Sequence, residues 1–233
     1  MSIIADLHTH TLVSEHAYST VDEMVNSAKE KGFLALAITD HGPNSSDGAK
    51  PVHFKAMHNL PDYINGVRLL RGCEANIVDY SGKVDLSDNI LEYLDFVIAS
   101  YHEDSIQPLT EEDHTNGYVG IIKNPHIDCL GHVGNPKFQF DIKYIVKLCK
   151  EYNKLIEINS SSFKVRKGSA TICREVALAC KRYETNIVVT SDAHSMYKVG
   201  DFNDAVELLL SIDFPEHLIL NSDYYKLIEY LGI

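Results

Sequence analysis

The chain has no hydrophobic run long enough to cross a membrane. A spanning helix needs about 20 consecutive apolar residues, and no stretch of the 233 residues approaches that length. The start of the chain also lacks the basic, apolar and small-residue succession of a secretory signal peptide. We therefore expect a cytoplasmic protein with no membrane partner.

Positive charge is scarce. The sequence has 21 Lys and Arg against 33 Asp and Glu, a formal net charge of -12. Affinity for nucleic acids rests largely on Lys and Arg at phosphates, so we expect no nucleic-acid partner. A small anionic substrate remains compatible with this charge if metal ions supply local positive charge. The composition predicts nothing about oligomeric state.

Several common catalytic and structural motifs are also missing. The five cysteines form an odd set without C-x-x-C spacing, and most lie in apolar or amphipathic segments, which favours buried thiols over disulfides. There is no Gly-rich nucleotide cradle and no G-x-S-x-G nucleophile elbow. These absences argue against a P-loop enzyme and against a serine nucleophile.

What the chain does have is a repeated succession of apolar strand, polar loop and amphipathic helix. We expect strands near residues 3–10, 33–39, 67–70, 96–100, 129–131, 155–159 and 187–190. Ser19-Thr20 before Asp22-Glu23 predicts the start of the first helix. About seven strand–helix units in one undivided domain, residues 1–233, predict a parallel α/β sheet, either a barrel or an open doubly wound sheet.

The first ten residues carry the clearest chemical pattern. Asp6, His8 and His10 occupy alternate positions at the end of an apolar strand, so they are expected on one side of it. Two neutral imidazoles one repeat apart are a candidate pair of metal ligands. Asp6 is a candidate partner for the outer N–H of a metal-bound imidazole, and Asp40 could serve in the same way.

Further candidate ligands follow the ends of the other predicted strands. The set comprises His8, His10, His41, Glu74, His102, His132, Asp192 and His194, together with His16 in the first loop. Parallel α/β barrels gather the loops after their strands at one rim, so these donors are expected to converge. Seven imidazoles and two carboxylates exceed the needs of one ion and indicate two or three, an arrangement suited to phosphoester hydrolysis.

The loop after the sixth strand is the candidate for phosphate recognition. Residues 159–168 combine amides, hydroxyls and three cations before a helix, groups that suit a phosphate. Asn159, Arg166 and Lys164 are the candidate substrate-binding residues, and Lys137 is a weaker one. The remaining histidines, at 53, 58, 114, 126 and 217, lie away from strand ends and are expected to be structural or exposed, although the first two could line the loop over the site.

Taken together, Asp6-x-His8-x-His10, His16, Thr39-Asp40-His41, Glu74 and Ser191-Asp192-Ala193-His194 resemble the motifs of the PHP (polymerase and histidinol phosphatase) superfamily, in the same order and over nearly the whole chain. The pattern is most similar to its YcdX-like phosphatase branch. The resemblance implies a distorted (β/α)7 barrel with three ions, usually zinc, at the C-terminal ends of the strands. Manganese or iron are alternatives at one or more sites.

The same resemblance implies how the ligands divide. His8, His10, Glu74 and Asp192 would hold one ion, and Glu74 would bridge to a second ion held by His102 and His132. His16, His41 and His194 would hold the third. Glu74 and Asp192 are then the expected catalytic residues, with Asp192 assisting proton transfer.

The expected activity is hydrolysis of a small phosphomonoester by a metal-activated hydroxide, and histidinol phosphate is one possible substrate because members of the superfamily act on it. The alternatives are a phosphodiesterase or nuclease of the PHP type, an amidohydrolase-like enzyme, and a metal-binding regulatory module without turnover. No candidate carbamylated lysine follows a predicted strand, which weighs against the amidohydrolase alternative.

Overall fold

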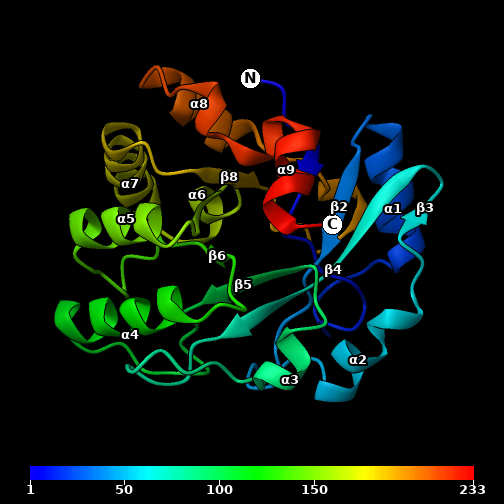
Figure 1. The fold of residues 1–233 in the computed structure, drawn as a ribbon, viewed down its shortest axis with the longest axis horizontal. Helices are drawn as coiled ribbons and strands as arrows, with labels where there is room; N and C mark the ends of the chain where they lie inside the picture. Colours follow the sequence, from blue (N-terminus) through cyan, green and yellow to red (C-terminus); the bar gives the residue numbers. More distant parts are fainter.

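The computed structural model describes residues 1–233, and a sheet of mostly parallel strands forms its centre (Figure 1). The parallel strands pair in the order β1 (Ala5–Asp6), β2 (Ala35–Ile38), β4 (Val67–Asn76), β5 (Phe96–Ser100), β6 (Cys129–Leu130), β7 (Leu155–Asn159) and β8 (Ile187–Thr190). A bridge between Thr9 and Ala193 brings the first and last strands together. The sheet is thus nearly closed, which confirms the expected (β/α)7 barrel.

Helices surround this sheet (Figure 1). They are α1 (Val21–Glu30), α2 (Pro51–Ala56), α3 (Asp88–Leu91), α4 (Glu111–Lys123), α5 (Ile142–Glu151), α6 (Ser162–Val165), α7 (Ser169–Tyr183), α8 (Asn203–Ser211) and α9 (Tyr224–Leu231), with short 3₁₀ turns at Met57–Asn59, Met196–Lys198, Glu216–Leu218 and Leu220–Ser222. None of the helices combines the length and apolar content needed to span a bilayer.

Local capping explains where the main helices begin. Thr20 accepts a hydrogen bond from the backbone N–H of Glu23, whose carboxylate accepts one from the backbone N–H of Thr20. Thr110 and Asp113 form the same reciprocal pair at the start of α4. Each pair satisfies backbone donors that a helix otherwise leaves free. The helix start predicted at Ser19-Thr20 is therefore confirmed.

Two apolar clusters lie on opposite sides of the sheet. The smaller one fills the barrel interior with 12 buried residues that include Ala35, Phe96, Leu155 and Val188 from four of the strands. Leu227 of α9 belongs to it, so α9 closes one end of the barrel, as its position across the centre of Figure 1 shows. The larger cluster, of 48 residues, packs the outer face of the sheet against the helices. All five cysteines are free and buried.

Asn221 completes the seam between the first and last strands. Its Nδ2 donates to the carbonyl oxygens of Ala5 (2.8 Å) and Val189 (2.7 Å), and its Oδ1 accepts from the N–H of Val189 (3.0 Å). The backbone oxygen of Asn221 also accepts from Ile4 (2.9 Å). One fully buried side chain thus takes the place of ladder hydrogen bonds that β1 and β8 do not make with each other.

The strand around Glu74 is longer than the sequence predicts. We expected it to end at Leu70, but β4 continues to Asn76 because residues 72–76 pair with β5. Gly72 permits this pairing, since a Cβ there would lie 2.5 Å from the carbonyl oxygen of Phe96. Glu74 therefore projects from within a rigid strand.

The antiparallel strand β3 (Tyr63–Ile64) is an addition to the expected fold. It pairs with the start of β4 through a turn at Asn65 and Gly66, both with positive φ. The signal in the sequence is the Asn-Gly pair, which favours a two-residue hairpin turn.

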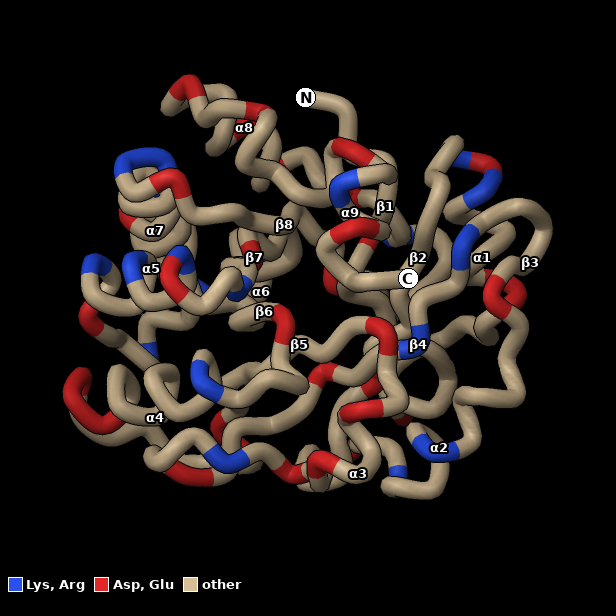
Figure 2. The backbone as a smooth tube through the Cα atoms, in the orientation of Figure 1, with Lys and Arg blue, Asp and Glu red and all other residues tan.

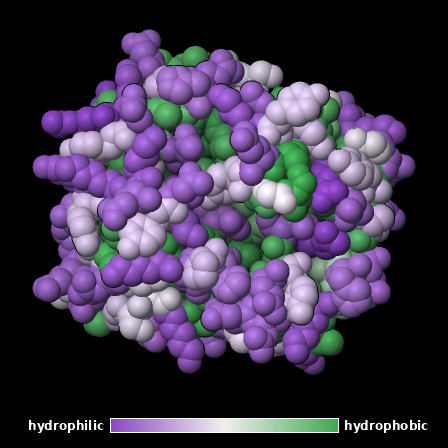
Figure 3. Space-filling view, viewed as in Figure 1, coloured by the Kyte–Doolittle hydropathy of each residue, from purple (hydrophilic) through white to green (hydrophobic).

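Charged residues of both signs are spread along the chain (Figure 2). Figure 2 shows Lys and Arg interspersed with Asp and Glu along the chain rather than gathered in one basic stripe. The face in Figure 3 is mostly hydrophilic, with apolar atoms visible in recesses and beside α9. This distribution agrees with the acidic composition of the chain.

Replacing Asn221 with Ala is expected to lower the free energy of unfolding by about 3 kcal/mol, because buried backbone groups on both strands lose their partners. Urea unfolding followed by circular dichroism measures the change. The control is Asn116→Ala on the exposed face of α4, which should change stability by less than about 0.5 kcal/mol. An Asn221→Ala protein as stable as the control would show that the seam does not depend on this side chain.

Candidate metal centre

The predicted ligands converge at one end of the barrel. A cavity of about 460 Å³ opens there, and His16, His41, Glu74, His102, His132, Asp192 and His194 all line it. His8 and His10 are fully buried, and their ring nitrogens lie within 3.6 Å of Glu74 and Asp192. Donors from separate strand ends therefore share a single site, as the barrel topology requires. We refer to these nine residues as the donor cluster.

Glu74 lies at the centre of the donor cluster. Its Oε2 is 2.8 Å from His41 Nδ1 and 3.3 Å from His8 Nε2. Its Oε1 is 2.9 Å from His132 Nε2 and 3.3 Å from His102 Nε2. The two oxygens thus address two separate groups of imidazoles, a geometry that suits a carboxylate bridging two cations.

Asp192 also contacts His8 and His10, the two histidines that follow the first strand. Its Oδ1 is 3.3 Å from His10 Nε2 and 3.6 Å from His8 Nε2. Asp192 has a φ of +55° and His132 a φ of +24°, a region that side-chain-bearing residues seldom occupy. Such strain often marks functional sites, and here both residues belong to the donor cluster.

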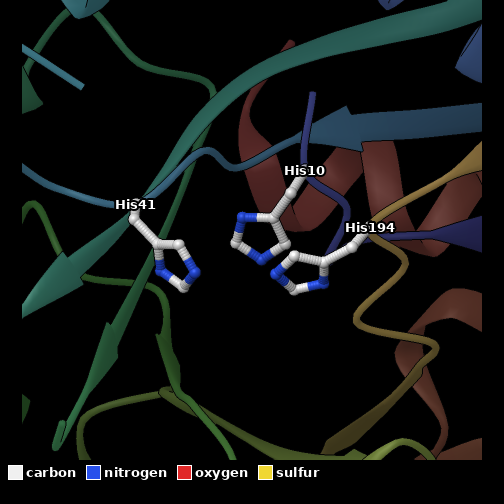
Figure 4. A group of neighbouring side chains, drawn as sticks. All are labelled: His10, His41 and His194. Carbon is white, nitrogen blue, oxygen red and sulfur yellow. The ribbon is translucent and has the colours of Figure 1, made fainter. Parts of the chain in front are cut away.

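Three imidazoles from different loops face a common space (Figure 4). The ring of His10 lies 4.2 Å from that of His194 and 4.3 Å from that of His41. The ring of His16 lies 4.2 Å from His194 and 5.4 Å from His41. His16 is the most exposed of the nine, with 51% of its side chain accessible.

The outer nitrogens of several rings are held by neighbours. Nδ1 of His8 donates to Glu157 (2.6 Å), Nδ1 of His102 donates to Asn76 (2.6 Å), and Nδ1 of His194 donates to the carbonyl of Asp192 (3.0 Å). Metal-ligating histidines typically use one ring nitrogen in this way, which orients the other toward the ion. The arrangement is that of a ligand set with its supporting partners.

Glu157 is a functional residue that the sequence reasoning missed. It lies in the middle of β7, and its side chain is fully buried. Besides His8, it accepts hydrogen bonds from Thr190 Oγ1 (2.6 Å) and from the backbone N–H of His132. An acid inside an otherwise apolar strand was the available signal, because such a residue needs a buried partner.

The pKa shifts of two histidines and of both carboxylates in the donor cluster favour the forms that bind metals. Burial lowers the pKa of His10 to about 3, with His41 adding to the effect, and burial also lowers the pKa of His132 to about 4. Burial opposes ionisation of Glu74 and Asp192, but His8 and the other nearby imidazoles hold the pKa of both carboxyls well below the usual range. Neutral imidazoles and ionised carboxylates are the forms that ligate metals.

The pKa of His8 is shifted in the opposite direction, because acids surround this residue. Burial alone would lower its pKa, but Glu157, Glu74 and Asp192 raise that pKa well above the usual value. Three carboxylates therefore create a position that favours positive charge.

Buried polar atoms that lack a hydrogen-bond partner indicate whether these residues could bind metal ions. The buried polar atoms of the cluster that have no hydrogen-bond partner are His8 Nε2, His10 Nε2, His41 Nδ1, both Glu74 oxygens, Asp192 Oδ1 and His194 Nε2. Buried polar groups are normally satisfied, and all of these atoms point into one site. Sets such as His8, His10 and Glu74, or His41, Glu74 and His102, place their ligand atoms within 4.8 Å of one another. The residues therefore fit divalent cations.

Asp6 does not lie where the alternation of the first strand predicts. Its carboxylate accepts hydrogen bonds from Ser191, through both backbone and side chain, and from the backbone N–H of Gly200 (2.8 Å). Leu7 packs in the barrel interior while His8 also reaches inward to Glu157, so the regular alternation stops where β1 ends. Asp6 consequently faces the segment that carries Asp192, and Glu157 instead takes the place of the imidazole partner.

Asp40 is linked to His10 through the side chain of Ser14. Its carboxylate accepts from Thr11 N–H (2.7 Å), Thr11 Oγ1 (2.8 Å) and Ser14 Oγ (2.8 Å). Ser14 Oγ in turn lies 3.4 Å from His10 Nδ1. His53 Nε2 is 3.5 Å from Asp40, so His53 is part of this surrounding network and not of the cavity wall.

The three predicted substrate-binding residues have different positions. Arg166 lines the cavity and donates to Ser162 Oγ (3.0 Å). Asn159 is fully buried and directs its Nδ2 to Asp192 (3.1 Å) and Glu157 (3.3 Å). Lys164 lies outside this cavity and pairs with Asp204 (3.0 Å) and Asp201 (3.4 Å). The geometry thus supports Arg166 alone, because acids engage the other two.

The remaining candidates contribute little to the site. Lys137 pairs with Glu103 (2.6 Å) on the surface. His114 is buried and bonded to the carbonyl of Gln139 (2.7 Å), and His58 is bonded to the carbonyl of Lys55 (2.6 Å). Both histidines thus have hydrogen-bonded positions outside the donor cluster, in agreement with the structural or exposed positions that the sequence predicts.

Replacing Glu157 with Gln is expected to weaken zinc binding by about 10–100-fold, the usual effect of removing an imidazole partner. Competition with a chromophoric chelator measures the affinity. Glu151→Gln, on the exposed surface of α5, is the matched control and should bind like the parent. Parent-like affinity in Glu157→Gln would show that His8 does not need this carboxylate.

Comparison with known proteins agrees with this site. The PHP domain family model matches residues 6–163. Proteins named probable phosphatase from Acetivibrio thermocellus (44% identity, 99% of this chain, 96% of the relative) and Clostridium novyi (43% identity, 99% and 95%) match almost end to end. The fold is similar to a histidinol phosphate phosphatase of Lactococcus lactis solved with zinc, L-histidinol and phosphate (TM-score 0.66, 17% identity, 92% of this chain and 95% of the other). This chain belongs to the PHP domain family.

Proposed function

We propose that residues 1–233 form a single PHP-type domain that hydrolyses a small phosphomonoester with the help of divalent metal ions. The observation that carries the proposal is the donor cluster, whose unpaired buried nitrogens and oxygens converge around Glu74. The family membership and the phosphatase names of its relatives support the same activity.

We further propose three zinc ions. His8, His10, Glu74 and Asp192 would hold the first, and Glu74, His102 and His132 the second. His16, His41 and His194 would hold the third. The two-sided contacts of Glu74 support its bridging role, and the zinc in the Lactococcus lactis structure supports the choice of metal. Manganese and iron also accept such mixed ligands.

Bound divalent ions would lower the pKa of water to about 7 and neutralise charge on phosphoryl oxygens. The protein's own residues would prepare the site for that chemistry. Glu157, Asn76 and Ser14 hold the outer ring nitrogens of His8, His102 and His10. Asn159 holds Asp192 through Oδ2, which leaves Oδ1 facing the cluster and places Asp192 to accept a proton there.

Arg166 supplies the remaining recognition of the phosphate. It lines the cavity together with Ser161, Ser45 and Asp47. A guanidinium donates several hydrogen bonds in a planar fork that matches phosphate oxygens. A cavity of about 460 Å³ holds a phosphate with a small leaving group and is at the lower end of ordinary ligand sites.

Removing metal is expected to abolish p-nitrophenyl phosphate hydrolysis, because without cations nothing in the donor cluster lowers the pKa of water or neutralises the phosphoryl oxygens. Zinc added back after chelation should restore the rate. The rate is measured before and after dialysis against a chelator, and the metal content is measured in parallel. Full activity in protein without bound metal would contradict the proposed mechanism.

Glu74→Ala is expected to lower the rate by at least about 10³-fold, because the carboxylate between two groups of imidazoles is lost. Circular dichroism should show that the variant remains folded. Glu92→Ala, at the exposed end of α3, is the control and should have the parent rate. Hydrolysis by Glu74→Ala at that same rate would refute a catalytic role for Glu74.

The choice of ester is tested by comparing p-nitrophenyl phosphate with bis(p-nitrophenyl) phosphate. We expect the monoester to be hydrolysed at least about 10-fold faster, because its dianion gains more from cations and Arg166. A faster reaction with the diester would indicate a PHP-type phosphodiesterase instead.

A further inference from the structure

Asp47 lies beside the most exposed histidine of the donor cluster. It belongs to the loop of residues 42–49 after β2, and it lines the same cavity as His16, His41 and His194. Its Oδ2 contacts Nδ1 of His16. None of the ligand assignments above gives Asp47 a role.

His16 needs an orienting partner more than the other histidines do. Half of its side chain is exposed, whereas His8 and His10 are fully buried and fixed by packing. Its ring is stacked on that of His194 at 4.2 Å, a contact that does not distinguish the two ring orientations related by a half turn about the Cβ–Cγ bond. A hydrogen bond to one ring nitrogen removes that ambiguity and selects which nitrogen faces the ion.

The pattern in the rest of the cluster indicates what Asp47 does. His8, His102 and His194 each direct Nδ1 to an oxygen acceptor outside the centre. Nδ1 of His16 meets Asp47 in the same way. The contact therefore repeats the arrangement by which these three histidines are held.

The loop that carries Asp47 is built to keep it in place. Ser45 Oγ donates to Asp47 Oδ1 (2.8 Å) and lies 3.0 Å from Asp104 Oδ2, while the carbonyl of Asp47 accepts from Glu15 N–H (3.2 Å). Gly48 allows the tight turn, since a Cβ there would lie 1.9 Å from the carbonyl oxygen of Gly42. Contacts of Ser45 and of the Asp47 backbone thus link three loops at the rim.

We propose that Asp47 is the positioning residue for His16: its carboxylate holds Nδ1 and directs Nε2 toward the outermost metal position. This rests on the proposed function, because it presupposes that His16 ligates an ion. It predicts that loss of Asp47 and loss of His16 affect the same ion and leave the buried positions occupied.

The test compares zinc content and affinity in the full-length protein for Asp47→Ala, Asp47→Asn, His16→Ala and the Asp47→Ala/His16→Ala double variant. Glu15→Ala is the matched control, because it removes an acidic charge next to His16 from an exposed side chain. Zinc equivalents are measured after dialysis at fixed free zinc, and affinity by chelator competition. The melting temperature of the zinc-free proteins reports on structural damage.

We expect Asp47→Ala to weaken the binding of one zinc equivalent by about 10–100-fold, with an unchanged melting temperature of the zinc-free protein. Asp47→Asn should weaken it less, because the amide oxygen still accepts from Nδ1. The double variant should lose no more than His16→Ala alone, and Glu15→Ala should match the parent.

Three outcomes overturn this proposal alone. Parent-like zinc binding by Asp47→Ala would remove the basis for a positioning role, and so would a double variant that loses more zinc than His16→Ala. A loss in Glu15→Ala equal to that in Asp47→Ala would assign the effect to general charge. A parent protein that binds no zinc would refute the proposed function as well, so the two failures are distinguishable.

Discussion

A buried carboxylate among imidazoles is the constraint on which this site depends. Glu74 is 1% exposed, and four ring nitrogens lie within 3.3 Å of its two oxygens. An ionised carboxylate removed from water must be compensated by positive charge. The nearby imidazoles, His8 first among them, hold the pKa of Glu74 well below its usual range, and bound divalent cations would supply that positive charge while leaving the imidazoles neutral. The long β4 ladder, paired on both sides, holds the carboxylate where those cations would lie.

Residues on other strands of the barrel orient the side chains of the donor cluster. His8 follows β1, yet its outer nitrogen is held by Glu157 on β7, and Glu157 also binds Thr190 on β8. Asn159, two residues beyond Glu157, holds Asp192 in its left-handed conformation. These orienting residues therefore lie on a different strand from the one that their ligand follows, and closing the sheet at Asn221 keeps those strands in register.

The sequence predicted the parts of the site that follow from topology. Parallel strands end at one rim, so His41, His102 and His132 could be brought together without knowing any side-chain conformation. The sequence did not predict side-chain positions that depend on local backbone conformation or on partners far along the chain. Asp6 turns away because the alternation stops after Leu7, and Lys164 is engaged by acids of a later segment. Neither fact has a local pattern, since each depends on residues far along the chain.

The donor cluster is graded in exposure from the barrel interior to the rim. His8 and His10 are inaccessible, 15% of the His102 side chain and 26% of the His194 side chain are accessible, and His16 reaches 51%. Withdrawing an exposed donor exposes little apolar surface, whereas withdrawing His8 would require opening the barrel. Displacing the inner histidines therefore requires unfolding of the barrel, whereas displacing His16 requires only a local rearrangement of its loop. His16 lines the cavity, so a phosphate of the proposed substrate would reach the position nearest the solvent first.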